Sequence, residues 1–210
     1  MKQIAPYRTL QGALNALDNG GRFYNVFTKA KDEVITDSEL FKAAGVFSGK
    51  AQAFLFFELA LSDLSEADRD HVIQRLSGEL RSAYLRQRPK RTEIEVFEQV
   101  VRETDAVIVA GFPVFLEDKT QFSGFIFIPI CTGKVTTFMM VPIFDKFDVY
   151  EVYANSDLTG DKTIIATVRG SKRLSPALTT FGGIVKKLKF KNESERTHSF
   201  YVETLFYKTA

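Results

Sequence analysis

The residues with the most distinctive chemistry are cations near the carboxyl end of the chain. Residues 162–192 hold eight Lys and Arg and no Asp or Glu. In this segment Lys187, Lys189 and Lys191 alternate with Leu188 and Phe190, which is the period of a β-strand with one basic face. Such a row can bind the phosphates of a single-stranded nucleic acid. We therefore predict an anion-binding site made of Arg169, Lys172, Arg173, Lys187, Lys189 and Lys191.

A second basic cluster lies in residues 81–91, which carry five basic and no acidic side chains. Cations are favoured where a helix ends, so this cluster also has a purely structural explanation. Residues 92–161 hold four basic and twelve acidic side chains. If the two basic clusters share one surface, the prediction of an anionic partner gains support. If they do not, each could instead face the acidic block of its own chain or of a second copy.

One acidic residue falls in an apolar surrounding. Glu58 lies within the run Phe54-Leu-Phe-Phe-Glu-Leu-Ala-Leu61, which we expect to be the most buried helix. A buried carboxylate must be paired or protonated. Glu58 is thus a candidate buried acid, either catalytic or held by an arginine.

Other chemistries lack their usual residues. Cys131 is the only cysteine, and His71 and His198 have no metal-ligand neighbours at helical or hairpin spacing, so we predict no metal site. The motifs of nucleotide binding, serine hydrolases and zinc peptidases are missing, so we predict no cofactor and favour a protein that is not an enzyme. No secretory signal or spanning apolar run is found, which predicts a cytoplasmic protein without membrane contact.

The elements that position these residues change character along the chain. Residues 1–91 have helical apolar spacing and predict a helical domain, with capping patterns at Thr36-Asp-Ser-Glu39 and Ser65-Glu-Ala-Asp68. We expect one long helix from Ser65 to Arg88, and Ser48 as the cap of the central helix. A linking helix after the Thr92–Glu95 box would join the two halves.

Residues 92–210 predict that linking helix and then a β domain. About seven runs rich in Val, Ile, Phe, Thr and Tyr are bounded by turn residues, and no segment could form the helical crossovers of a parallel sheet. The fold class expected is α+β, with an N-terminal helical bundle followed by an antiparallel β-barrel or sandwich. As a barrel with a basic strand, the β domain is similar in architecture to an oligonucleotide-binding fold.

A hairpin within the β domain does not alternate between apolar and polar residues. The runs Phe125–Cys131 and Phe138–Phe144 are apolar at successive positions, so both faces of the hairpin 125–144 should be covered. The helical half, a second copy or another partner could cover it. A homodimer through this hairpin is one of these alternatives.

Together these features predict a non-catalytic binding or accessory protein whose basic strand contacts an anionic partner, either single-stranded nucleic acid or an acidic protein surface. Three alternatives stay open at this point. The barrel could bind an apolar small molecule, the chain could be a homo-oligomeric structural protein, or an enzyme could be built around Glu58. A solvated strand face, with lysines that protect an edge from aggregation, would also explain the basic row.

Overall fold

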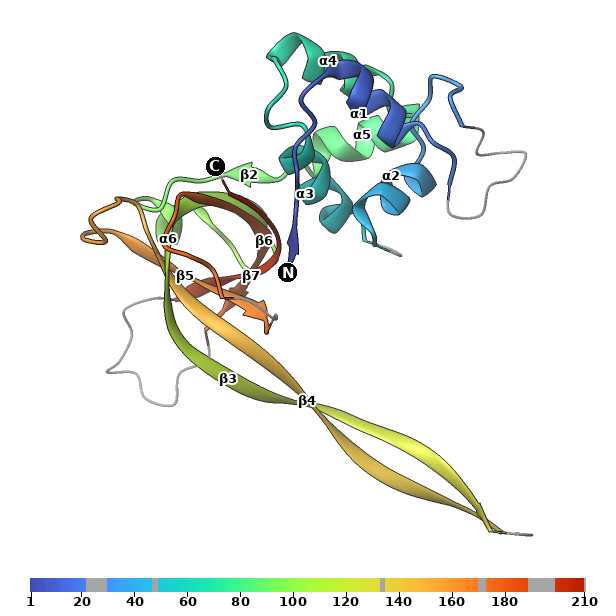
Figure 1. Cartoon of the computed structure of the whole chain (residues 1–210), viewed down its shortest axis with the longest axis vertical. Helices are drawn as coiled ribbons and strands as arrows, with labels where there is room; N and C mark the ends of the chain where they lie inside the picture. Colours follow the sequence, from blue (N-terminus) through green and yellow to red (C-terminus); the bar gives the residue numbers. More distant parts are fainter. Residues whose placement is uncertain (22–29, 47–48, 133–134, 170–172, 189–198, 210) are drawn as a thin grey trace.

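The computed structural model has a helical region, a β-barrel and a long β-hairpin that extends away from both (Figure 1). It describes residues 1–21, 30–46, 49–132, 135–169, 173–188 and 199–209, and within these the side chains of all but 119–145. The α+β class and the order of helices before barrel strands agree with the sequence analysis.

The helical region is built from short helices with local caps. Thr36 and Glu39 form a complete capping box, and the Ser65 side chain accepts a hydrogen bond from the Asp68 N–H, as the sequence predicts. The five helices are α1 (Leu10–Leu17), α2 (Asp37–Ala44), α3 (Lys50–Ala60), α4 (Glu66–Gln74) and α5 (Gly78–Arg86).

Three sequence expectations about the helices are wrong or fall outside the described residues. The long helix from Ser65 to Arg88 is broken into α4 and α5, because Leu76 makes a β-bridge with Ile35 between them. The Thr92 box does not cap a helix: α6 (Phe97–Val100) is a single turn that begins after Val96 without a side-chain cap. Helix α3 begins after Gly49, and Ser48 lies outside the described residues.

Helix α3 is the centre of the molecule. Its residues from Ala53 to Ala60 are all buried, which agrees with an apolar sequence on nearly every side of the helix. One face packs on the barrel, where the missing side chain of Gly182 gives room to Leu59 and Leu55. The same core cluster includes Ile108 and Phe206 of the barrel, so α3 joins the helical region to the β domain.

The barrel consists of five strands that close on themselves. They are β3 (Ala106–Thr132), β4 (Val135–Tyr153), β5 (Lys162–Val168), β6 (Thr179–Lys187) and β7 (Phe200–Thr209). The order is β3-β4-β5-β7-β6, and β6 pairs with β3 to close the ring. Short strands β1 (Lys2–Gln3) and β2 (Lys90–Arg91) add to β7 and β3, so both ends of the helical region are held by the barrel sheet.

The strand pattern corrects the sequence analysis in two respects. The sequence predicts four separate strands at Ala106–Glu117, Phe122–Cys131, Val135–Phe144 and Phe147–Tyr153, whereas the first two runs are continuous in β3 and the last two in β4. The sheet is also not purely antiparallel, because β5 and β7 pair in parallel at Ile165↔Val202. No helical crossover is needed for this contact, since the chain passes through β6 between the two strands.

The barrel interior is filled by its own side chains. Tyr150, Val152, Ile165, Phe181 and Val202 are buried in one core cluster. Phe97 of α6 is fully buried in the same cluster. A packed interior does not favour the alternative of an apolar ligand held inside the barrel.

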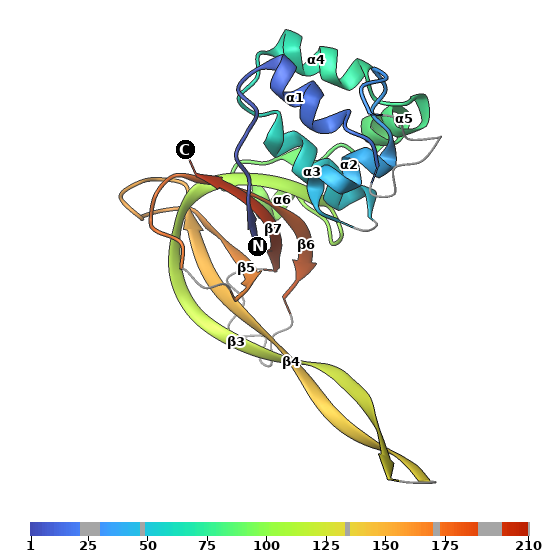
Figure 2. The ribbon, with the colours of Figure 1, turned by 45° about the vertical axis from the view of Figure 1, so that its right-hand side comes forward.

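The hairpin is the outer part of β3 and β4. Beyond Asp118 and Asp148 these strands pair with each other down to Thr132 and Val135. In both ribbon views this part of the hairpin points away from the helices (Figures 1 and 2). The helical region therefore does not lie against residues 125–132 and 135–144, the described part of the apolar hairpin.

Candidate functional site

The predicted basic residues lie at two separate places on the barrel. Arg169 follows β5 and Arg173 lies in the connection to β6, whereas Lys187 is the last residue of β6 and pairs with Phe200. By strand register, Phe200 lies level with residue 163, so Lys187 and Arg169 are about 20 Å apart along the strand direction, at about 3.3 Å per residue. Lys172, Lys189 and Lys191 lie outside the described residues.

Arg169 is held by two aspartates of its own chain. Its Nε donates to Asp148 Oδ1 at 3.1 Å, and its Nη2 makes a short contact with Asp118 Oδ2. The hydrogen bond from Arg169 lowers the pKa of Asp118. Asp148 is buried, so Arg169 pairs with an acid that has little contact with water, and the Arg169 charge is compensated by acids of its own chain.

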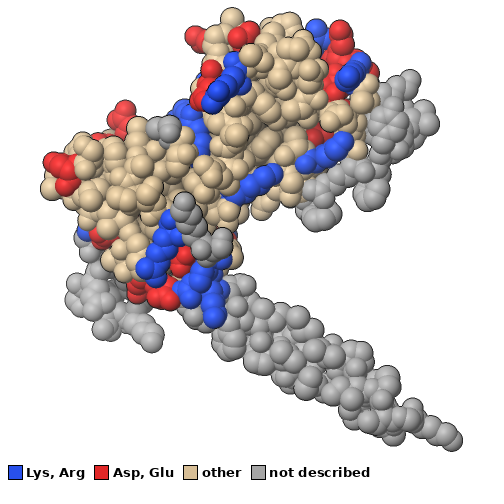
Figure 3. Space-filling model, in the orientation of Figure 1, with Lys and Arg blue, Asp and Glu red and all other residues tan. Residues whose placement is uncertain are grey.

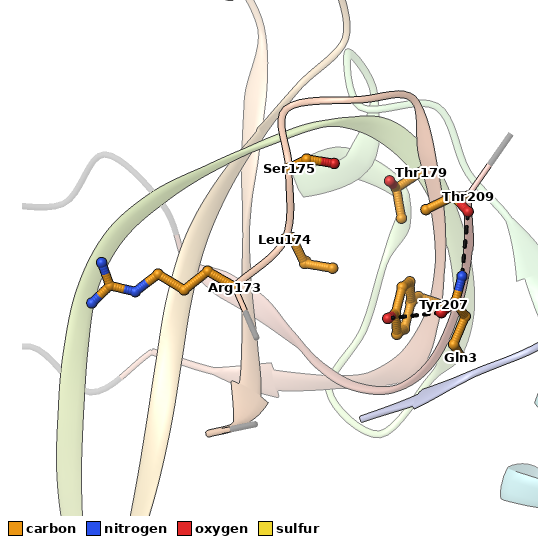
Figure 4. Close-up of a pocket in the computed structure, with 7 residues that line it drawn as sticks. All are labelled: Gln3, Arg173, Leu174, Ser175, Thr179, Tyr207 and Thr209. Atoms are coloured by element: carbon orange, nitrogen blue, oxygen red, sulfur yellow. Dashed lines mark hydrogen bonds between the residues drawn. The ribbon is translucent and has the colours of Figure 1, made fainter. Parts of the chain in front are cut away.

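Arg173 is committed to an aromatic ring. Its guanidinium carbon lies 3.7 Å from the ring centroid of Phe115, and that ring in turn meets Tyr150 edge-on. A pocket of about 150 Å³ at this barrel mouth is lined by Arg173, Leu174 and Tyr207, but Figure 4 shows the Arg173 side chain pointing away from the other lining residues. The pocket is therefore bordered by hydroxyl and amide groups rather than by this cation.

The outer face of β3, β4 and β5 is the surface that sequence reasoning missed. Tyr150 and Val152 point into the core, so the alternate residues Glu151 and Tyr153 point outward. The strand register aligns the outward side chains in two rows that cross the three strands. One row consists of Phe112, Tyr153 and Lys162, and the other consists of Val114, Glu151 and Ile164. Leu116 and Val168, at the far end of this face, are 49% and 55% exposed.

Polar contacts order the first of these rows. Lys162 donates to Glu151 Oε1 at 2.7 Å, and its ammonium lies 5.5 Å from the ring centroid of Tyr153. The Tyr153 hydroxyl donates to Glu151 Oε2 at 2.7 Å. The Tyr153 ring is thus fixed in place while it is still partly open to solvent, as a stacking surface requires.

Glu58, the predicted buried acid, is paired. Its side chain is 1% exposed, and its oxygens accept from Tyr84 Oη at 2.5 Å, Arg88 Nε at 2.5 Å and Arg69 Nη2 at 3.0 Å. Burial raises the pKa of Glu58, but the hydrogen bonds from Tyr84 and Arg88 and the charges of Arg88 and Arg69 outweigh it, so the pKa is lowered. Such a carboxylate is a weak base, which does not favour a catalytic role.

The second basic cluster faces mostly its own chain. Arg88 pairs with Glu58, Arg91 lies 3.5 Å from the same carboxylate, and Lys90 pairs with Asp105 of the acidic block. Arg169 and Lys162 likewise pair with acids of that block. Figure 3 shows red and blue atoms side by side where the hairpin leaves the barrel. Much of the charge segregation in the sequence is therefore complementary within the folded chain.

Comparison of the chain with protein-family models and with curated proteins finds no match. Over the residues that the structure describes, no group of three or more His, Cys, Asp and Glu could hold a metal ion. Within the same residues, no helix is long and apolar enough to span a bilayer.

Proposed function

We propose that this chain is a non-catalytic, nucleic-acid-binding accessory protein that holds a single strand on the outer face of β3, β4 and β5. The observation that carries the proposal is the topology of the barrel. Strands β3, β4 and β5 follow one another, β6 returns to β3, and β7 closes the ring between β6 and β5, parallel to β5. This is the arrangement of the oligonucleotide-binding fold, whose second and third strands carry the ligand.

The chemistry of the outer face supports this proposal. Phe112 and Tyr153 are neighbours in register and partly exposed, and Val114 and Ile164 extend the apolar surface beside them. Nucleobases stack on such side chains with little dependence on sequence, at about 1–3 kcal/mol per base. Lys162 ends the row, where its ammonium packs over the Tyr153 ring and is paired with Glu151.

The connections that border this face carry the basic residues of the original prediction. In oligonucleotide-binding barrels the loops after the first and fourth strands flank the ligand. Here the first is the long β3–β4 hairpin, and the second begins after Lys187 and includes, in sequence, Lys189 and Lys191. Arg173 lies near the other end of β5 and supplies a cation there, whereas Arg169 at the same end is paired with Asp118 and Asp148.

Direct binding measurements test the proposal. Fluorescence anisotropy with a labelled oligothymidylate should show an affinity that falls as the salt concentration rises. A plot of the logarithm of the association constant against the logarithm of the salt concentration should have a slope of about −0.7 for each phosphate neutralised. Exchange of Lys187, Lys189 and Lys191 for Glu should abolish binding, whereas Arg81→Glu, on the exposed part of α5, should leave it unchanged. Tyr153→Ala should weaken binding about fivefold or more. Affinity that does not depend on salt, or equal loss in the Arg81 variant, would contradict the proposal.

A second role is favoured by the hairpin. We infer that residues 125–144 serve self-association, because this backbone extends away from the rest of the chain while its sequence is apolar at successive positions. Light scattering should show a dimer or larger assembly, and replacement of 125–144 by a short Asn-Gly turn should give a monomer whose barrel still unfolds cooperatively. A monomeric full-length chain would rule this role out.

A further inference from the structure

The helical region holds a cluster of arginines that the proposed nucleic-acid face does not use. Arg69 of α4, Arg88 after α5 and Arg91 of β2 come from three different elements and meet at Glu58 of α3. We call these three residues the arginine cluster. It brings three positive charges against a single buried carboxylate.

The hydrogen-bonding capacity of Glu58 is already filled. A carboxylate has about four acceptor positions. Here the Tyr84 hydroxyl, Arg88 Nε and Arg69 Nη2 donate to the two oxygens, and Arg91 Nη2 approaches Oε2 at 3.5 Å. Each guanidinium has five N–H donors, so most donors of the cluster are not used by Glu58. Arg88, for example, contacts Glu58 through Nε, and within the described part of the chain its two terminal nitrogens make no hydrogen bond.

The neighbouring acids do not remove the excess of positive charge. Among the described residues, Glu58 is the only carboxylate within ion-pair distance of Arg69, Arg88 or Arg91. Asp70 interacts with Arg88 electrostatically but makes no ion pair with it. Asp105 is paired with Lys90. Three guanidinium groups around the one carboxylate of Glu58 leave a net positive charge, which a further anion would reduce.

The cluster is also open to a ligand. The side chains of Arg88 and Arg91 are each 49% exposed, and that of Arg69 is 24% exposed, whereas Glu58 is 1% exposed. The carboxylate therefore fixes the arginines from the inside while their outer edges meet solvent. Tyr84, fully buried beneath Arg88, supports the same arrangement, with the guanidinium carbon 5.7 Å from the centroid of its ring.

We propose that the arginine cluster is a binding site for a phosphate group. A phosphate monoester carries close to two negative charges at neutral pH and offers oxygens in several directions, so it can accept from guanidinium groups that arrive from separate elements. A single carboxylate ligand would supply one charge and one plane of acceptors. The site lies in the helical region and does not depend on the outer face of the barrel.

Titration calorimetry with inorganic phosphate tests this site, with ionic strength held constant by chloride. The wild-type chain should bind phosphate, and Arg91→Gln should raise the dissociation constant about tenfold or more, which is the loss expected for a charge-assisted hydrogen bond. Arg81→Gln removes the same charge from an exposed position of α5 and should leave the constant unchanged. Arg91→Lys keeps the positive charge but loses the planar guanidinium group, so its affinity for phosphate should lie between those of the wild type and Arg91→Gln.

A second pair of probes distinguishes the source of the phosphate. An oligothymidylate with a 5′-phosphate and the same oligomer with a 5′-hydroxyl should differ in affinity, and Arg91→Gln should remove that difference, if the natural ligand is a polynucleotide end. Response to inorganic phosphate alone would indicate a free phosphate or a small phosphate ester. Tyr153→Ala should weaken both oligomers alike and leave their difference in affinity and the inorganic phosphate titration unchanged, which separates this site from the proposed nucleic-acid face.

Two results would overturn the proposal. One is the absence of a phosphate-dependent signal in the wild-type chain with either type of probe. The other is equal affinity in wild type and Arg91→Gln, provided that both melt at similar temperatures. Arg91 is half exposed and makes only a 3.5 Å ion pair with Glu58, so its replacement by Gln should not unfold the chain.

Discussion

Nε of Arg88 lies 2.5 Å from Oε1 of Glu58, although the Arg88 side chain is 49% exposed and that of Glu58 only 1%. The contact joins the innermost helix, α3, to the segment that leads from α5 into the barrel. A buried acid of the helical core thus contacts the segment through which the chain enters the β domain.

This pairing predicts that stability falls in acid. The pKa of Glu58 is below its ordinary value of 4.5 in the folded chain, so the folded state binds a proton less readily than the unfolded state. The stabilisation from Glu58 is therefore complete above about pH 5 and is lost as pH falls through the folded-state pKa. Urea unfolding should show that the free energy of unfolding falls more between pH 7 and pH 3 for the wild type than for Glu58→Gln.

The size of the Glu58→Gln effect is bounded by the exposure of its partners. Removing one member of a fully buried ion pair costs about 3–5 kcal/mol. Arg88 is half exposed and can be solvated by water once its partner is gone, so we expect Glu58→Gln to lower the free energy of unfolding by about 2 kcal/mol at pH 7. The difference between the two proteins should shrink towards pH 3. A difference that is constant with pH would mean that folding does not lower the pKa of Glu58.

The hydroxyl of Tyr84 should contribute separately. It donates to Glu58 Oε1 from a fully buried position, and its pKa is raised, first by burial and then by the hydrogen bond to the carboxylate. Tyr84→Phe keeps the ring packing against Phe54 and Phe57 but leaves the carboxylate one donor short. We expect a loss of about 1–2 kcal/mol in the free energy of unfolding. In the Glu58→Gln background the same substitution should cost less, and equal costs in both backgrounds would show that the two side chains are not coupled.

The two arginines near the β5–β6 connection should behave differently when each is replaced by Gln. Arg169→Gln leaves the buried Asp148 without its cation and should lower the free energy of unfolding more than Arg173→Gln does. Arg173→Gln loses only a cation–π contact, worth about 0.5–1 kcal/mol.

Oligothymidylate affinity should show the opposite order for these two variants. Arg169 is already neutralised by Asp118 and Asp148, so its loss should change affinity little, whereas loss of Arg173 should weaken it about fivefold. Chemical denaturation and anisotropy on the same two variants give both quantities. If Arg169→Gln weakened binding more than Arg173→Gln, the aspartates would not hold Arg169 in solution.

The sequence predicts local structure well where one residue decides it. The Thr36–Glu39 box and the Ser65 cap satisfy backbone donors three residues away, and that spacing is visible in the sequence. The burial of Glu58 follows in the same way, because apolar residues surround it on the helix. Pro129 and Pro142 lie where β3 and β4 have no second neighbour among the described strands, as expected for proline in a sheet.

Contacts between distant segments could not be predicted in this way. Nothing near Arg169 in the sequence identifies Asp118 and Asp148 as its partners, because strand register brings them together. The outer face of β3, β4 and β5 could not be predicted for the same reason. The sequence shows that Glu151 and Tyr153 alternate with Tyr150 and Val152. It does not show that Tyr153 lies beside Phe112 and Lys162, because that depends on the pairing of three strands. The break between α4 and α5 was missed because it depends on the bridge from Leu76 to Ile35.

A pair of glycine variants tests whether the barrel closes as described. Gly183 lies at a bulge between β6 and β7, where a Cβ would lie 2.6 Å from Val202 Cγ1 and would meet the carbonyl oxygen of Glu203. Backbone cannot move aside cheaply, so Gly183→Ala should destabilise the chain by about 1–3 kcal/mol. Gly78 at the start of α5 has open space around it, and Gly78→Ala should be neutral or stabilising by up to about 1 kcal/mol. Thermal melts of both variants would measure the contrast, and a Gly183→Ala protein as stable as wild type would show that β6 and β7 do not pair through this bulge.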